Sequence, residues 1–164
     1  MLSILTYPDA RLKVESEVVT DFDAELHDFI AALEQTLRAG PGAVGIAAPQ
    51  VGRAQRIVLV DLSARPKCEN HGRLILINPE ITAWQGMEKG REGCLSVPDF
   101  TGNVIRARQI VLQAQDEYGA PHEYEMQGFE ARAVQHEIDH LDGLLFLDRL
   151  VSRRNDLFRR KAYL

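Results

Sequence analysis

The stretch QHEIDHLDG, residues 135–143, places two histidines four positions apart, with a glutamate directly after the first. Apolar residues recur at helical spacing through the stretch and the segment before it: Phe129, Ala133, Val134, Ile138 and Leu141. Gly143 follows as a terminator, so the pattern predicts a helix that ends there. Residues four apart on a helix differ by about 40° in direction and share one face. We therefore expect His136 and His140 to be able to bind one metal ion.

Glu137 lies about 100° around the helix from His136. It would point away from the ligand axis but could still reach a water molecule on the metal and act as a base. This His-Glu-x-x-His pattern is typical of metallohydrolases, in which a metal lowers the pKa of its water from about 15.7 to about 7. The alternative is an inert helix with a polar face, because four fixed residue types also arise by chance.

Two imidazoles leave the ion short of a third protein ligand. No histidine follows His140, and Asp139, Asp142 and Asp148 are weak candidates. Upstream, Cys94 in REGCLSVP follows a glycine and precedes an extended segment, and its thiolate would complete a Cys-His-His site. A lone cysteine is more often a small buried hydrophobic residue, which is the alternative interpretation.

The rest of the chain reads as one α+β domain over residues 1–164. Residues 22–39 have an aspartate cap, apolar residues at helical spacing and a following glycine, which predict a helix. A stretch of small residues over 40–52 suits close backbone approach. The patterns after it predict strands over 56–62 and 74–84, a surface loop between them over 63–73, and a hairpin over 103–128. Residues 149–164 suggest a short basic helix or a frayed tail.

Composition limits the function classes. With 164 residues, 45% hydrophobic and 26% charged, the chain has the composition of an ordinary globular domain, and a net charge of −5 gives no broad basic surface. We therefore expect no direct nucleic-acid specificity. The N-terminus has no signal or transit pattern and no segment approaches a membrane span, so we expect no membrane association and a cytoplasmic location. Cys68 and Cys94 are too few for a disulfide framework.

Three ordered motifs, GIAAPQ at 45–50, EGCLS at 92–96 and QHEIDH at 135–140, resemble the signatures of peptide deformylases. The opening ILTYPDARLK, the INPEI segment, the hairpin and HLDGLLFLDRL also resemble that family, so nearly the whole chain is covered in family order. The resemblance implies a small α+β domain with mixed or antiparallel sheets around a central helix that carries the His-Glu-x-x-His motif. It also implies removal of the formyl group, as formate, from the N-terminal methionine of newly made proteins.

The resemblance makes Cys94, His136 and His140 the metal ligands, with Glu137 passing a proton from metal-bound water to the departing amine. It also implies that the side-chain amide of Gln50 and the backbone N–H of Leu95 stabilise the negative charge that develops on the carbonyl oxygen. Gly45 would let the peptide backbone pass closely, and Glu92 would orient neighbouring groups. Taken alone, GIAAPQ would read as a tight turn between strands, and Glu92 as an exposed acid.

The resemblance further implies one divalent metal ion, Fe²⁺ in the cell, with Zn²⁺, Ni²⁺ or Co²⁺ able to occupy the purified protein. The partners would be nascent formyl-methionyl polypeptides, and we expect a monomer. The tail carries five basic residues: Arg153, Arg154, Arg159, Arg160 and Lys161. They could contact the ribosome, and the alternative is that they form a solvated helix face. A ribosome-associated binding module with a structural metal is a further alternative. Structural sites usually have four protein ligands, whereas three are found here, which favours catalysis.

Two positions depart from the family pattern. Ala43 stands where the first motif usually begins with glycine and would be strained if that position required a positive φ. Thr101 stands about where many members carry an arginine or tyrosine that helps to hold the substrate, so a deformylase-like metallohydrolase with a shifted substrate preference is the alternative. Arg106 could supply a positive charge near that position; the alternative is a solvated strand residue, and on that interpretation we place Arg106 outside the site. Three histidines without partners at ligand spacing are interpreted as surface residues: His27, His71 and His122.

Overall fold

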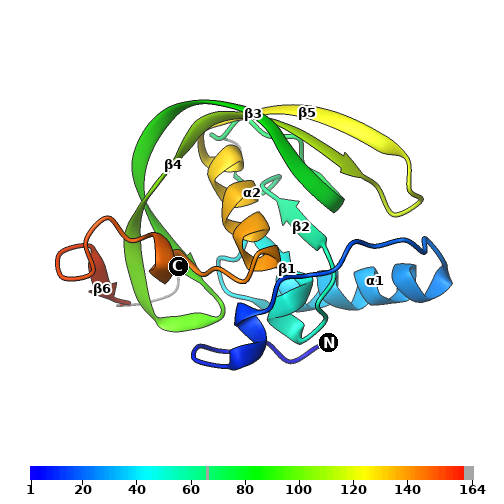
Figure 1. Ribbon diagram of the computed structural model, residues 1–164, viewed down its shortest axis with the longest axis horizontal. Helices are drawn as coiled ribbons and strands as arrows, with labels where there is room; N and C mark the ends of the chain where they lie inside the picture. Colours follow the sequence, from blue (N-terminus) through cyan, green and yellow to red (C-terminus); the bar gives the residue numbers. More distant parts are fainter. Residues whose placement is uncertain (66, 161–164) are drawn as a thin grey trace.

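The helix that carries the two motif histidines lies at the centre of the molecule. A computed structural model describes residues 1–65 and 67–160, and in it this helix is α2, Gly128–Leu141. It packs against strands β1, β2, β4 and β5, and the sheet curls over it (Figure 1). Gly143 follows the helix with a φ of 77°, as expected for a glycine terminator. The predicted α+β arrangement around a central helix is confirmed.

The sheet is six-stranded and each pair of its strands is antiparallel. Its strands run in the order β1-β2-β3-β4-β5, and β6 pairs with β4. The strand bounds are β1 Gly45–Ala47, β2 Ile57–Asp61, β3 Arg73–Cys94, β4 Val97–Gln115, β5 Pro121–Gln127 and β6 Leu157–Arg159. The remaining elements within residues 1–65 and 67–160 are α1 Ala24–Ala39 and three short 3₁₀ turns, η1 Ala10–Lys13, η2 Ala48–Val51 and η3 Phe146–Arg149.

Alternation along β2 and β3 divides the core into two layers. Val58, Val60 and Leu76 point to the side of α2, whereas Ile57, Leu59 and Ile77 point to the side of α1. Successive side chains of a strand face opposite sides, so one pair of strands supports both helices. Helix α1 begins after Asp23, whose carboxylate accepts a hydrogen bond from the Leu26 N–H at 3.0 Å, which confirms the predicted aspartate cap.

The β3–β4 hairpin brings Cys94 to the central helix. Register shifts interrupt the pairing near Ile77 and Ile81 and again at Gly93, and such bulges bend a strand. At the far end Cys94 pairs with Val97, so Leu95 and Ser96 form the tip of the hairpin. The sequence predicted a strand only to residue 84, whereas β3 continues to Cys94. The continuation was missed because residues 85–92 are mostly polar and exposed.

Two further expectations are settled by the backbone. Among the described residues, the only non-glycine with a positive φ is Asn78, so Ala43 carries no strain of that kind. The predicted basic helix over 149–164 is wrong for the described part, because residues 157–159 form strand β6 instead. The alternative of a frayed tail over the same residues does not hold for 157–159 either, and residues 161–164 lie outside the described residues. No helix among the described residues is long and apolar enough to span a membrane.

Candidate metal centre

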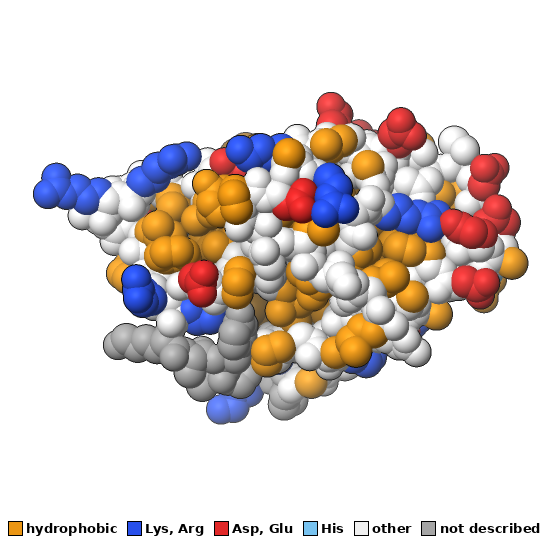
Figure 2. All heavy atoms as spheres, turned by 90° about the horizontal axis from the view of Figure 1, so that it is seen from below, with side chains coloured by type: hydrophobic (Ala, Val, Ile, Leu, Met, Phe, Trp, Pro, Cys, Tyr) orange, Lys and Arg blue, Asp and Glu red, His pale blue; other side chains and the backbone are white. Residues whose placement is uncertain are grey.

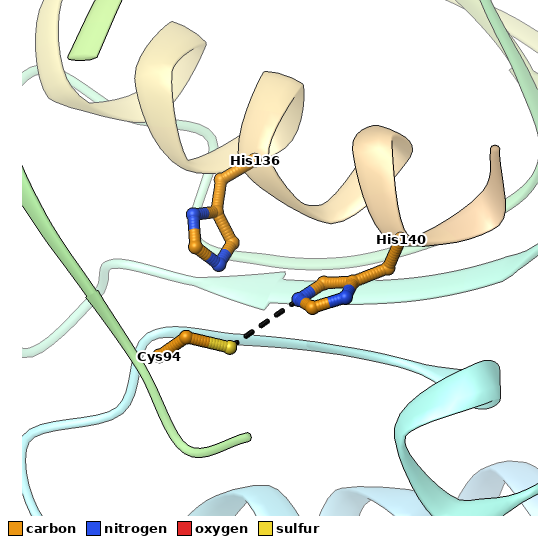
Figure 3. Close-up of side chains that lie close together, drawn as sticks. All are labelled: Cys94, His136 and His140. Carbon is orange, nitrogen blue, oxygen red and sulfur yellow. Dashed lines mark hydrogen bonds between the residues drawn. The ribbon is translucent and has the colours of Figure 1, made fainter. Parts of the chain in front are cut away.

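Cys94, His136 and His140 converge in the interior. Their ligand atoms lie within 4.8 Å of one another, and all three residues are buried. Figure 3 shows the two imidazole rings projecting from successive turns of α2 toward the sulfur of Cys94, which comes from the end of β3. Sγ of Cys94 lies 3.4 Å from Nε2 of His140. This is the one group of three potential ligands found within residues 1–65 and 67–160.

The spacing of the three ligands fits a single transition-metal ion. With a metal–sulfur distance of about 2.3 Å, a metal–nitrogen distance of about 2.1 Å and a tetrahedral angle, sulfur and nitrogen lie about 3.6 Å apart. The observed separation between Sγ and Nε2 is 3.4 Å, close to that value. A thiolate with two imidazoles suits zinc, iron, cobalt or nickel rather than calcium or magnesium. The three protein ligands leave a fourth position for water or substrate.

Glu92 fixes the orientation of His136. Nδ1 of His136 donates to the Glu92 carboxylate at 2.8 Å, which turns Nε2 toward Cys94 and His140. Burial alone would raise the pKa of Glu92, but hydrogen bonds from Arg106 and His136 hold it well below its usual range. Glu92 is 7% exposed, so the interpretation as an exposed acid is excluded.

Arg106 supports Glu92 from behind, and its interpretation as a solvated strand residue is wrong. It is 4% exposed, and its guanidinium donates two hydrogen bonds to Glu92 at 2.9 Å and one to Asp139 at 2.5 Å. Arg132 adds a further hydrogen bond to Glu92 at 2.7 Å. Because a buried charge requires partners, the network holds the carboxylate beside His136.

The aspartates near the motif do not approach the ligand cluster. Asp139 pairs with Arg106 and Arg149, and Asp142 pairs with Arg56. Asp148 accepts a hydrogen bond from the backbone N–H of Leu145 at 2.9 Å. Among the described residues, the potential ligand that joins the two histidines is therefore Cys94 rather than a downstream carboxylate.

Glu137 is a buried carboxyl group beside the cluster. Its Oε1 lies 3.9 Å from Nε2 of His140 and has no hydrogen-bond partner among the described residues. Burial raises its pKa from 4.5 to about 7, although the charge of His136 opposes this shift. Gly45 leaves room for it, since a Cβ there would lie 2.7 Å from Oε2 of Glu137. A carboxyl group with a pKa near 7 can both take up and release a proton.

Gln50 and Leu95 both lie next to Cys94. The Gln50 side-chain carbonyl accepts from the Ala47 N–H at 2.9 Å, so the amide nitrogen faces the cluster. That nitrogen donates to Ser96 Oγ at 3.0 Å and to Cys94 Sγ at 3.4 Å. Leu95 occupies the hairpin tip next to the cysteine. The first motif is therefore a strand, β1, followed by the η2 turn, and this turn directs Gln50 into the site.

A cavity of about 520 Å³ opens beside these groups. Cys94, His136 and Glu137 line it together with Gly45, and apolar side chains form another part of the wall: Val44, Leu95, Phe129 and Pro41. The cavity thus joins a polar reacting end to an apolar surface, as sites for small organic groups do.

The three other histidines lie away from the cluster. His71 and His122 are exposed and pair with Glu130 and Asp116, which confirms their interpretation as surface residues. His27 is only half-exposed, and its Nε2 lies 2.7 Å from the Glu117 carbonyl oxygen. The surface interpretation of His27 is therefore only partly correct.

The sequence model of the polypeptide deformylase family matches residues 1–156. The chain belongs to the polypeptide deformylase family. A peptide deformylase from Thermodesulfovibrio yellowstonii is 40% identical over 98% of this chain and 96% of its own length. Peptide deformylase 2 of Vibrio cholerae is 44% identical over 99% of this chain and 94% of its own.

Solved deformylase structures share the fold. The peptide deformylase from Thermotoga maritima has a TM-score of 0.85 and 35% identity, covering 93% of this chain and 99% of that one. The enzyme from Legionella pneumophila has a TM-score of 0.86 and 36% identity, covering 94% and 89%. The chain is thus a hydrolase of this family that removes the N-formyl group from nascent peptides, as the sequence motifs predicted.

Proposed function

We propose that Cys94, His136 and His140 hold one divalent metal ion, Fe²⁺ in the cell, at which the formyl group is hydrolysed. The observation that carries this proposal is the convergence of the three buried ligand atoms within 4.8 Å. A divalent ion there would acidify a water molecule and polarise the formyl carbonyl. Because sites with nitrogen and sulfur ligands generally bind Co²⁺, Ni²⁺ and Zn²⁺ at least as tightly as Fe²⁺, any of these ions can replace iron in purified protein.

Glu137 is the proton carrier in this proposal. It takes a proton from the attacking water and delivers it to the departing amine, so one group serves as base and then as acid. Its raised pKa of about 7 suits both roles at neutral pH. Its unpartnered Oε1 beside His140 is the atom available for the transfer.

Gln50 and Leu95 stabilise the negative charge that develops on the formyl oxygen. The Gln50 side-chain amide and the Leu95 backbone N–H act as donors next to Cys94. Gly45 lets the substrate backbone pass close to Glu137, where a side chain would intrude. Val44, Leu95 and Phe129 suit the unbranched thioether side chain of methionine.

We further propose that residues 1–164 are one catalytic domain that acts as a monomer in the cytoplasm, where its formyl-methionyl substrates are made. Contact with the ribosome would use the exposed arginines of the tail, and Arg153, Arg154 and Arg159 are exposed in its described part. Cosedimentation with ribosomes that weakens at high salt would support this contact. Cosedimentation equal to that of a variant with all three arginines changed to glutamine would contradict it.

Metal content and activity of four variants test the ligand assignment. Cys94→Ser, His136→Ala and His140→Ala should each lose bound metal and release of formate from formyl-Met-Ala-Ser. Cys68→Ser is the matched control, because Cys68 is a free cysteine outside the cluster, and it should keep both. A Cys94→Ser protein with full metal content would contradict the proposed ligand set.

The second candidate is a metallohydrolase with a shifted substrate preference. It is favoured by Thr101, whose hydroxyl accepts a hydrogen bond from Arg91 at 3.4 Å and does not line the cavity. Turnover of an internal peptide bond faster than of formyl-Met-Ala-Ser would support this candidate. The reverse ratio would support deformylation.

A further inference from the structure

Arginines form much of the charged wall of the cavity beside the metal cluster. Arg65, Arg91, Arg132 and Arg160 line it, together with two carboxylates, Glu92 and Glu137. Arg132 is tied to Glu92 and to the backbone carbonyls of Val104 and Glu88. Glu92 is in turn occupied by Arg106 and His136, so neither it nor Arg132 is available to a ligand.

Arg91 is held in place without an ion pair. Its guanidinium carbon lies over the Phe158 ring, 3.7 Å from the ring centre, in a cation–π contact that holds the group there. Its nitrogens donate to Asn103 Oδ1 at 3.2 Å and to Thr101 Oγ1 at 3.4 Å. Both acceptors are neutral, and no carboxylate among the described residues pairs with Arg91. Its positive charge is therefore available to a ligand in the cavity.

Strand β6 creates this arrangement. Phe158 pairs with Thr101 of β4, and Thr101 pairs with Gly93 of β3, so the ring reaches the side chain that precedes the EGCLS motif by one position. The same strand leads to Arg160 beside Gly93, where an added Cβ would lie within 2.4 Å of the Arg160 guanidinium.

Positive and negative side chains are also separated on the face of the molecule that Figure 2 shows. Figure 2 shows Lys and Arg side chains toward the end of the molecule that carries β6, and most Asp and Glu side chains toward the opposite end. Exposed Arg153, Arg154 and Arg159 belong to the segment around β6. Such a distribution attracts acidic peptides to the β6 side and repels basic ones.

We propose that the cavity prefers formylated peptides with an acidic residue at one of the two positions after methionine, and that Arg91 determines this preference. A planar guanidinium presents paired N–H donors that match a carboxylate. The inference rests on the proposed metal site, because it concerns the path of the bound substrate chain from that site through the cavity. It concerns selection among peptides rather than the hydrolysis itself.

Three sets of C-terminally amidated peptides test it: formyl-Met-Ala-Ala and versions with Glu or Lys at either position after methionine. A partly exposed charge pair changes an equilibrium constant by up to about fivefold, and exchanging attraction for repulsion squares that factor. We expect the better Glu peptide to exceed its Lys counterpart in kcat/KM by about 5-fold to 25-fold at low salt. The ratio should fall toward one at 0.5 M salt.

Variants assign the preference to Arg91. Arg91→Gln should bring the Glu-to-Lys ratio close to one, Arg91→Glu should invert it, and all forms should turn over the alanine peptide. Phe158→Ala should reduce the ratio by loosening Arg91. Arg108→Gln is the matched control, since Arg108 is exposed, does not line the cavity and lies outside the segment around β6, and it should keep the wild-type ratio.

Turnover of the alanine peptide distinguishes a failure of the proposed peptide preference from a failure of the proposed metal site. If that peptide is hydrolysed but wild-type protein shows equal kcat/KM for Glu and Lys peptides, the proposed preference is wrong while the metal site stands. A preference that Arg91→Gln leaves unchanged likewise overturns the role of Arg91. Failure to hydrolyse the alanine peptide would contradict the proposed function itself, and with it the inference.

Discussion

Replacing Glu137 by Gln should stabilise the metal-free protein, and the gain should depend on pH. The folded protein holds the Glu137 pKa at about 7 because the carboxyl group is buried, against 4.5 for an exposed group. Between these values the unfolded chain has released the proton and the folded protein has kept it. The unfolded state then binds fewer protons, so raising the pH from 4.5 to 7 favours unfolding.

The size of the effect follows from the shift. A difference of 2.5 between the two pKa values corresponds to about 3–4 kcal/mol, at about 1.4 kcal/mol per unit. Glutamine has the shape of glutamate but cannot ionise, so Glu137→Gln removes this cost. We expect the variant to exceed wild type in free energy of unfolding by about 3 kcal/mol at pH 8 and by about 1 kcal/mol at pH 5.

Urea unfolding of chelator-treated protein at both pH values measures the difference. Glu125→Gln is the control, because Glu125 is exposed in β5 and its replacement should change the stability little at either pH. His140 is present in every form, whereas the pKa of His136, which burial alone would lower, is raised by the charge of Glu137, so the comparison measures the coupled pair of Glu137 and His136. A difference between wild type and Glu137→Gln that is the same at pH 5 and pH 8 would refute the account of Glu137 as a buried, proton-holding group.

Three further predictions concern the reacting groups. Gln50→Ala should lower kcat on formyl-Met-Ala-Ser by about 10²–10³-fold, since an oxyanion donor is lost, and an effect on KM alone would assign Gln50 to ground-state binding. Gly45→Ala should lower kcat with the metal content unchanged, because the new Cβ would lie 2.7 Å from Glu137 Oε2 and displace the carboxylate. Metal analysis and steady-state kinetics of the variant check this, and a wild-type kcat would count against it. Iron-loaded protein should lose activity in air more slowly with catalase present, with oxidation at Cys94 rather than Cys68 in peptide mass spectra, whereas an unmodified Cys94 in inactivated protein would exclude thiolate oxidation as the cause.

Local patterns were enough to predict the two long helices and part of the site. Helical spacing placed His136, His140 and Glu137 correctly, because positions four apart share a helix face whatever the rest of the chain does. Cys94 could not be assigned by spacing, since it lies on a distant strand. Three ordered motifs and their resemblance to a family supplied it, and the structure places its sulfur beside His140.

The missed features depend on contacts between distant segments. Arg106 follows a strand pattern that is typical of solvent-exposed positions, and only the packing of α2 against β4 buries it between Glu92 and Asp139. The polar residues of β3 beyond Trp84 show no apolar alternation, so nothing local predicts that the strand continues to Cys94. Strand β6 is three residues long, too short for a periodic signal, and forms by pairing with β4.

Dependence of formate release on the metal tests the central claim most directly. Protein stripped by a chelator and kept anaerobic should hydrolyse formyl-Met-Ala-Ser at a negligible rate, and one equivalent of Fe²⁺ should restore turnover to wild-type protein but not to the Cys94→Ser variant. The bound iron should be removable and replaceable without unfolding, since the ligands are set by α2 and the β3–β4 hairpin. Equal formate release by the stripped and the iron-loaded protein would contradict the account.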